Sequence, residues 1–242
     1  MADDDKTTPA PAQARSEPAA TSQRAEIDAF IQRARTLAPP TEVGQRGRLI
    51  FALDATMSRQ PTWDTACTLQ GEMFREAGSI GGLDVQLVYF RGLNECRASR
   101  WVSDGAGLGN LMARIHCMGG HTQIRKVLQH AHAESDRAKV AALVYVGDAM
   151  EEAIDDLAAA AGELGLRGIP AFMFHEGHDP IAEQAFREIA RLTRGAYCRF
   201  DLSAAHELGE LLRAAAVYAA GGVKALTAQH SEGARKLLAQ MR

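Results

Sequence analysis

The sequence predicts an α/β fold that is doubly wound: a mostly parallel sheet with one antiparallel edge strand and helices on both faces. From residue 48 onward, strand-like and helix-like segments alternate, which is the pattern of parallel strands joined by helices. Residues 140–146 (VAALVYV) are the most apolar strand candidate and are expected near the middle of the sheet. Residues 96–102 alternate polar and apolar side chains, as expected of a half-exposed edge strand.

Hydrophobic periodicity and turn residues set the expected order of the elements. Strands are expected at residues 48–53, 83–90, 96–102, 140–146, 169–174 and 196–200. Helices are expected at residues 63–77, 108–117, 122–133, 154–164, 181–192 and 204–218. In such a sheet, ligands bind outside the carboxyl ends of the strands, so residues that directly follow strands are the candidates for a site.

Composition divides the chain into four segments. Residues 1–23 are rich in Ala, Pro, Thr, Ser and charge, which predicts a disordered tail. Residues 24–45 hold one short amphipathic helix and a linker that contains Pro39 and Pro40. Residues 46–220 form the α/β domain, and residues 221–242 are expected to be a helical appendage.

The composition also limits the kind of partner. With 46% hydrophobic and 24% charged residues, the chain is typical of a soluble globular protein. Its net charge of -3 provides no overall field for a polyanion, which argues against nucleic acid as a partner. No apolar run reaches the roughly 20 residues that cross a bilayer, and the start is acidic and Pro-rich, unlike a secretory signal. We therefore expect a cytoplasmic protein without membrane attachment.

Four cysteines without a CxxC pair are expected to be buried, reduced thiols: Cys67, Cys96, Cys117 and Cys198.

Oxygen-bearing side chains gather in three loops that follow or precede the expected strands and helices. Asp54, Thr56 and Ser58 come directly after the first strand, at alternate positions that point the same way in an extended loop. Asp148 follows the central strand, and Thr122 ends a Gly-rich turn at the entrance of a helix. Such hard oxygen ligands suit Mg²⁺ or Mn²⁺.

These three pieces together resemble the metal-ion-dependent adhesion site (MIDAS) of von Willebrand factor type A (VWA) domains, which have a Rossmann-like fold. The resemblance covers about residues 46–218. The chain resembles stand-alone bacterial VWA proteins in particular. It implies that Thr56 and Ser58 contact the metal directly, that Thr122 does so in one conformational state, and that Asp54 and Asp148 act directly or through water. Two positions depart from the family pattern: Thr56 replaces the more frequent Ser, and Ala149 replaces the Gly that often follows the Asp.

The resemblance implies a protein interaction module in which the metal keeps one coordination position for an Asp or Glu of a partner. Stand-alone relatives often work beside AAA+ ATPases or chaperones, so such complexes are the expected partners. We expect no catalytic residue and no enzyme activity. Two alternatives remain open: a metal-dependent hydrolase or phosphoryl-transfer enzyme that uses the same cation as a Lewis acid, and a metal-free scaffold.

Four further residues are candidates for a partner-binding rim around the metal: Arg59, Trp63, His121 and His175. Arg and Trp are frequent in interface hot spots. For Trp63 the alternative is inward packing, and for His121 it is a solvent-exposed turn.

Two pairs of residues have more than one interpretation. His175 and His178 could extend the site toward zinc, but a loop that caps the helix at Pro180 is favoured. Glu151 and Glu152 could enlarge the carboxylate cluster, but we interpret them as first-turn acids of the helix that follows.

Overall fold

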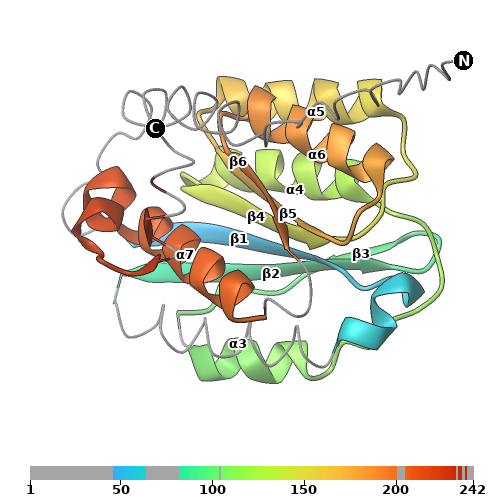
Figure 1. The fold of residues 1–242 in the computed structure, drawn as a ribbon, viewed down its shortest axis with the longest axis horizontal. Coiled ribbons are helices and arrows are strands. Elements are labelled where there is room, and N and C mark those ends of the chain that lie inside the picture. The colour runs from blue at the N-terminus through green and yellow to red at the C-terminus, as the bar shows by residue number, and fades with distance from the viewer. Residues whose placement is uncertain are drawn as a thin grey trace, which may run out of the picture.

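The computed structural model describes residues 46–63, 82–103, 105–200, 205–232, 234–235 and 238 (Figure 1). The predicted tail at residues 1–23, the predicted helix at 24–45 and most of the predicted helix at 63–77 lie outside the described residues.

Within the described residues, six strands form one sheet in the order β3-β2-β1-β4-β5-β6. The strands are β1 (Gly47–Asp54), β2 (Leu83–Arg91), β3 (Glu95–Ala98), β4 (Ala142–Gly147), β5 (Ala171–Glu176) and β6 (Ala196–Phe200). All neighbouring pairs are parallel except β2 and β3, which are antiparallel. The predicted sheet, its antiparallel edge strand and the central place of residues 140–146 are therefore confirmed.

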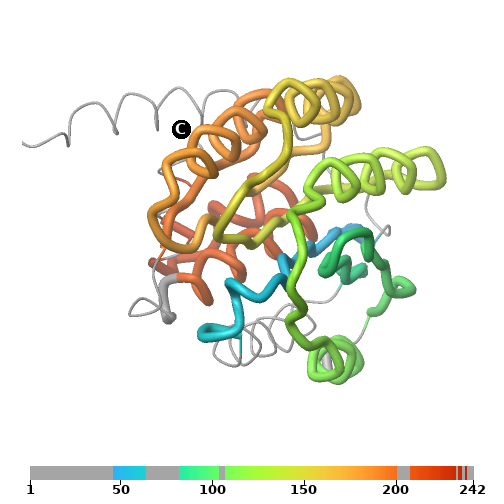
Figure 2. The backbone as a smooth tube through the Cα atoms, turned by 90° about the vertical axis from the view of Figure 1, so that its right-hand side faces the viewer, coloured from blue at the N-terminus to red at the C-terminus, as the bar shows by residue number. Residues whose placement is uncertain are grey.

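Helices cover both faces of the sheet, as Figure 2 shows with the strands viewed end-on. The helices are η1 (a 3-10 helix, Met57–Thr62), α3 (Gly105–Met112), α4 (Ile124–Arg137), α5 (Ile154–Leu166), α6 (Pro180–Leu192) and α7 (Ala205–Ala228). Helices α3 and α7 pack on the face that includes Phe51, whereas α4, α5 and α6 pack on the face that includes Ile50 and Ala52. Because successive side chains of a strand point to opposite faces, β1 is buried on both sides.

The C-terminal segment packs on its own domain. Helix α7 continues to Ala228 across a kink at Gly222, whose φ of 66° lies in the left-handed region. Beyond this kink, Leu226 and Ala234 are both 0% exposed and belong to the core that contains Phe51. The predicted appendage is thus continuous with the domain core at these positions. None of the described helices combines the length and the apolar content that a membrane span requires.

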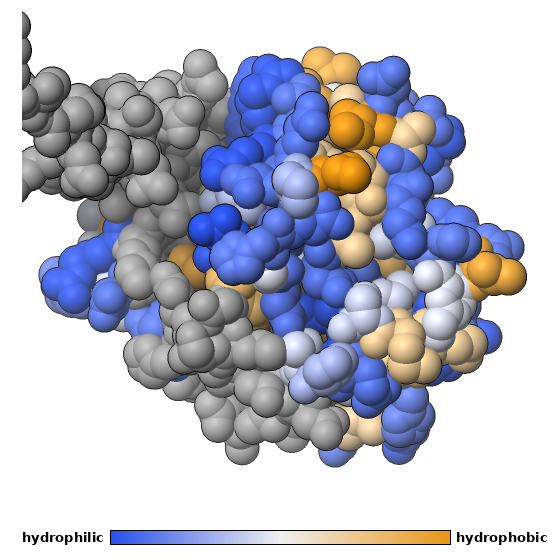
Figure 3. All heavy atoms as spheres, turned by 45° about the vertical axis from the view of Figure 1, so that its right-hand side comes forward, coloured by the Kyte–Doolittle hydropathy of each residue, from blue (hydrophilic) through white to orange (hydrophobic). Residues whose placement is uncertain are grey.

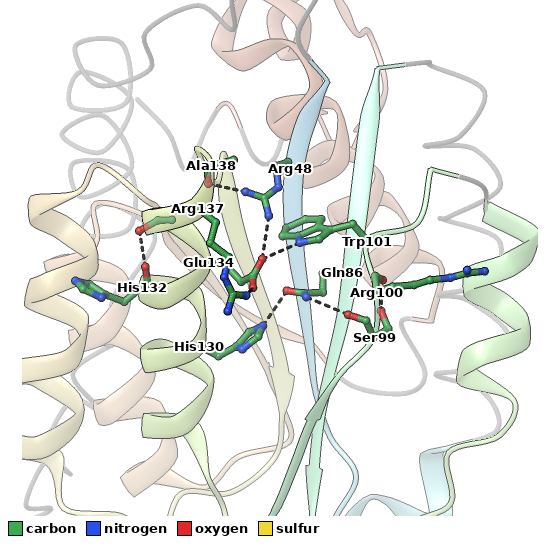
Figure 4. Close-up of polar contacts among 11 residues, drawn as sticks. Arg48, Gln86, Ser99, Arg100, Trp101, His130, His132, Glu134, Arg137 and Ala138 are labelled. Atoms are coloured by element: carbon green, nitrogen blue, oxygen red, sulfur yellow. Dashed lines mark hydrogen bonds and ion pairs between the residues drawn. The ribbon is translucent and has the colours of Figure 1, made fainter.

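A buried carboxylate ties the amino-terminal edge of the sheet together (Figure 4). Glu134 of α4 is 3% exposed, and its Oε2 accepts hydrogen bonds from Arg48 Nη2 at 2.9 Å and Trp101 Nε1 at 2.8 Å. The Arg48 guanidinium lies 3.9 Å from the centre of the Trp101 ring, and Arg137 contacts the other Glu134 oxygen. This network joins α4 to the start of β1 and to the segment after β3.

Candidate functional site

The carboxyl ends of β1, β4 and β5 form one edge of the sheet, at the end where η1 lies in Figure 1. Asp54 is the last residue of β1, and Asp148 directly follows β4. The register pairs Leu53 with Val146 and Gly147 with His175, so the residues that follow these strands are neighbours. The sheet therefore places Asp54 and Asp148 at the same edge, as predicted.

Both aspartates hold a buried oxygen without a hydrogen-bond partner. Asp54 is 0% exposed, and its Oδ1 accepts a hydrogen bond from the Thr56 backbone N–H at 2.8 Å. Its Oδ2 and the Oδ1 of Asp148 are buried and have no partner. In the loop after Asp54, the Thr56 and Ser58 hydroxyl oxygens lie 3.1 Å apart. An unpaired buried carboxylate oxygen is costly, and a cation would satisfy it, so these residues fit the metal that the resemblance to VWA domains implies.

The Gly-rich loop reaches the same edge through backbone contacts. Met118 N–H donates to the Ala55 carbonyl at 3.0 Å, and Met118 pairs with Thr56 in a parallel bridge. Further along, Thr122 is 5% exposed, and its hydroxyl accepts a hydrogen bond from the Glu151 N–H at 3.0 Å. A Cβ at Gly120 would lie 2.0 Å from the Gly92 carbonyl oxygen, so the close approach of these two loops requires glycine. The loop is thus attached both to the residues after β1 and to those after β4.

Glu151 and Glu152 cap a different helix from the one predicted. The Oε2 of Glu151 accepts from the Thr122 N–H at 3.1 Å, and the Oε2 of Glu152 accepts from the Arg125 N–H at 2.9 Å. Both carboxylates therefore serve the amino end of α4, whose own N-cap residue Gln123 makes no side-chain cap. The prediction that they are first-turn acids of the following helix is wrong, because α5 begins only at Ile154.

Burial raises the pKa of Asp54 to about 6, and the charge of Asp148 adds to this rise, whereas hydrogen bonds from Thr56 and the charge of Arg59 oppose it. The folded-state pKa exceeds the ordinary value of 3.8, so the proton is bound more tightly in the folded protein. Without metal, the stability that this protonation contributes is complete below the ordinary value and is lost as pH rises through about 6.

We therefore expect Asp54→Asn to stabilise the metal-free protein progressively, relative to wild type, as the pH rises from 3.8 to about 6, with no further gain well above 6. The gain should reach about 3 kcal/mol well above the folded-state pKa, because the amide is neutral at every pH. Urea unfolding in chelator at several pH values measures it. A stability difference between the two proteins that does not change with pH would contradict the assigned pKa.

Three of the four predicted rim residues lie in the interior. Arg59 is 1% exposed, Trp63 is 5% exposed and donates its Nε1–H to the Ile115 carbonyl at 3.0 Å, and His175 is 0% exposed. His175 Nδ1 lies 2.9 Å from the Tyr197 hydroxyl, and burial lowers the pKa of this imidazole. Buried side chains cannot contact a partner, so these three are corrected to interior residues. His121 is exposed and stays a candidate for the rim.

Three exposed side chains around this edge are apolar, and the sequence analysis did not single them out. Met57 is 53% exposed, Met118 is 44% exposed and Leu93 is 78% exposed. Their segments are adjacent, because Met118 pairs with Thr56, which precedes Met57, and its Sδ lies 3.4 Å from the position of a Cβ on Gly92, which precedes Leu93. Figure 3 brings this side of the molecule forward and shows apolar groups set among hydrophilic residues. We refer to Met57, Leu93 and Met118 as the apolar collar.

The segment after β5 forms a helix cap. Asp179 is the N-cap of α6, and its Oδ1 accepts from the N–H groups of Ile181 at 2.8 Å and Ala182 at 3.2 Å. The favoured interpretation of this segment is confirmed.

Within the described residues, no three His, Cys, Asp or Glu side chains are grouped as ligands for a metal. A site of two carboxylates and three hydroxyls would not form such a group.

Comparisons with known proteins identify the fold. No protein-family model matches the sequence, and no curated protein does. A von Willebrand factor type A structure from Catenulispora acidiphila superposes with a TM-score of 0.58 at 17% identity, over 71% of this chain and 43% of that chain. The vWF domain of the type V pili tip protein Mfa5 from Porphyromonas gingivalis gives 0.60 at 10% identity, over 78% and 98% of the two chains. Proximal thread matrix protein 1 from the mussel byssus, with a zinc-occupied MIDAS motif, gives 0.57 at 14% identity, over 71% and 46%.

The chain therefore has the VWA fold, as the sequence predicted. It spans less than half the length of the Catenulispora and mussel chains, and at these identities the likeness concerns the fold alone.

Proposed function

We propose that this protein is an interaction module that binds an acidic residue of a partner protein through a divalent cation, Mg²⁺ or Mn²⁺. The residues that would hold the cation are Asp54, Thr56, Ser58, Thr122 and Asp148. The observation that carries the proposal is the pair of buried, unpaired oxygens, Asp54 Oδ2 and Asp148 Oδ1, at one edge of the sheet. When bound, the cation would supply a Lewis-acidic position that accepts a carboxylate.

The roles of the individual side chains follow from their contacts. Thr56 and Ser58 present adjacent hydroxyl oxygens, and the Oδ1 of Asp54 fixes their loop through the Thr56 N–H. Thr122 accepts one hydrogen bond from Glu151, which leaves a second lone pair on its hydroxyl oxygen for a cation. Glu151 and Glu152 are positioning residues, because they hold the amino end of α4 and thereby the Thr122 loop.

The apolar collar supports a protein partner in particular. Met57 begins η1, whereas Leu93 and Met118 lie on loops at the same edge of the sheet, and exposed apolar side chains that cluster at one place are typical of interaction surfaces. Methionine adapts its shape to a bound surface, so Met57 and Met118 would accommodate apolar residues beside the partner's Asp or Glu. The mussel neighbour with a zinc-occupied MIDAS motif supports divalent metal binding by this fold. The resemblance to stand-alone VWA proteins directs the search for a partner to ATPase and chaperone complexes.

Removing the metal should release the partner. We expect a protein captured by the tagged full-length chain in millimolar Mg²⁺ to be lost in chelator and recovered when Mg²⁺ is restored, because the cation forms part of the contact. Met118→Asp, which adds a charge to the apolar collar, should lower capture without lowering metal affinity. Capture that withstands the chelator contradicts the proposal, and turnover of phosphatase substrates that Asp54→Asn abolishes would favour the enzymatic alternative instead.

A further inference from the structure

A buried arginine lies at the same edge as the two aspartates. Arg59 of η1 is among the largest fully buried side chains, and its guanidinium contacts the carboxylate of Glu176, which ends β5. The side chains of Arg59 and Glu176 are 0% and 9% exposed. Taking two charges out of water is costly, so a buried pair on a candidate binding edge requires an explanation.

The contact between Arg59 and Glu176 spans two strands of the sheet that are not neighbours. Helix η1 follows β1, and Glu176 belongs to β5, two strand spacings or about 10 Å away across the sheet. The strand between them is β4, and the residue after it is Asp148. The Arg59–Glu176 contact therefore joins the segment after β1 to the end of β5, and Asp148 follows the strand that lies between these two.

The buried polar atoms without a hydrogen-bond partner at this edge belong to side chains of opposite charge, one arginine and two aspartates. The Nε and Nη2 of Arg59 have no hydrogen-bond partner, and neither do Asp54 Oδ2 and Asp148 Oδ1. Burial lowers the pKa of Arg59, and the charges of Asp148 and then Asp54 oppose that shift. The charge of Arg59 in turn acts to lower the pKa of Asp54. Electrostatically, Arg59 interacts with both aspartates as well as with Glu176.

We infer that the positive charge of Arg59 offsets the negative charges of Asp54, Asp148 and Glu176 when no metal is bound. The same charge therefore weakens the binding of a divalent ion at this edge. Well above pH 6, where Asp54 is ionised, the three carboxylates carry three negative charges and Arg59 one positive charge. These four side chains then have a net charge of −2, which a divalent ion would neutralise. Removing Arg59 or Glu176 should therefore shift the metal affinity in opposite directions. This consequence for the metal rests on the proposed function, whereas the compensation of the aspartates does not.

The first test uses Mn²⁺ alone, titrated into the purified full-length chain. We expect Arg59→Gln to tighten Mn²⁺ binding at least about tenfold and Glu176→Gln to weaken it at least about tenfold, because each change alters the local charge by one unit. The double variant keeps the net charge and should bind within about threefold of wild type. If Arg59→Gln alone does not fold, its effect is measured by comparing the Mn²⁺ affinity of Glu176→Gln with that of the double variant. The double variant should then bind Mn²⁺ more tightly than Glu176→Gln does. Shifts in the same direction, or no shift, would overturn the inference.

A matched control comes from the opposite edge of the sheet. Arg48 pairs with the buried Glu134 there, with side chains that are 16% and 4% exposed. Arg48→Gln should lower the melting temperature and leave Mn²⁺ affinity unchanged. If Arg48→Gln changed the Mn²⁺ affinity as much as Arg59→Gln does, the effect would come from a general loss of stability, and the inference would be overturned.

The second test is made in chelator and does not depend on a metal. Arg59→Gln should lower the melting temperature, and Asp148→Asn added to it should restore part of the loss, since one uncompensated carboxylate is removed. Strictly additive effects would show that Arg59 does not compensate Asp148 and would overturn the inference. A wild-type protein that binds no Mn²⁺ would contradict the proposed function alone, because this coupling would still be measurable.

Discussion

Asp148→Asn is expected to weaken Mn²⁺ binding by about a hundredfold or more and to abolish chelator-sensitive capture of the partner, while the protein stays folded. The amide has the size of the carboxylate but lacks its charge. The Oδ1 of Asp148 is buried and has no hydrogen-bond partner, so no hydrogen bond of that atom is lost in the metal-free protein. Isothermal titration with Mn²⁺ and circular dichroism in chelator measure the two parts of this expectation.

The control for Asp148→Asn is Asp155→Asn, in the first turn of α5. Asp155 is exposed and close in sequence, but it lies in a helix rather than at the strand end. The Asp155→Asn protein should bind Mn²⁺ with the affinity of wild type. Equal binding by wild type and Asp148→Asn would exclude Asp148 as a ligand and leave the metal-free scaffold as the better account.

The places of the strands along the chain and the position of the two aspartates at strand ends were predictable because they depend on short-range patterns. A buried parallel strand is a short apolar run, so residues 140–146 and 169–174 indicated β4 and β5 to within a few residues. Once the sheet is parallel, the ends of its strands share an edge, which places Asp54 and Asp148 there without any knowledge of side-chain contacts.

The surroundings of the candidate site depend on contacts between distant segments, which no local pattern contains. Arg59 and Trp63 follow the Asp54 loop and looked suited to a partner, but η1 turns both inward, toward Glu176 and the Ile115 carbonyl. Glu151 and Glu152 precede a helix in sequence, yet they cap α4, which lies earlier in the chain. A polar residue near a helix start indicates capping in general, and only the fold determines which helix it caps.

Glu134→Ala is expected to lower the free energy of unfolding by about 3 kcal/mol or more, because it leaves Arg48 and the Trp101 N–H without their buried acceptor. Hydrogen bonding from Trp101 and the charges of Arg137 and His130 outweigh burial and lower the pKa of Glu134. The stability that this group contributes is therefore present above the ordinary pKa of a glutamate and is lost as pH falls through the lowered value. Urea unfolding near neutral pH measures the loss.

Glu183→Ala provides the comparison for Glu134→Ala, since Glu183 pairs with Arg187 on the surface of α6 and its side chain is 30% exposed. An exposed pair of this kind contributes about 1 kcal/mol or less. A loss for Glu134→Ala no greater than this would show that the network of Figure 4 does not hold the edge together. Because that network lies at the edge away from Asp54 and Asp148, the folded Glu134→Ala protein should still bind Mn²⁺ with wild-type affinity. Stability and metal binding would then be properties of opposite ends of one sheet, each changeable without the other.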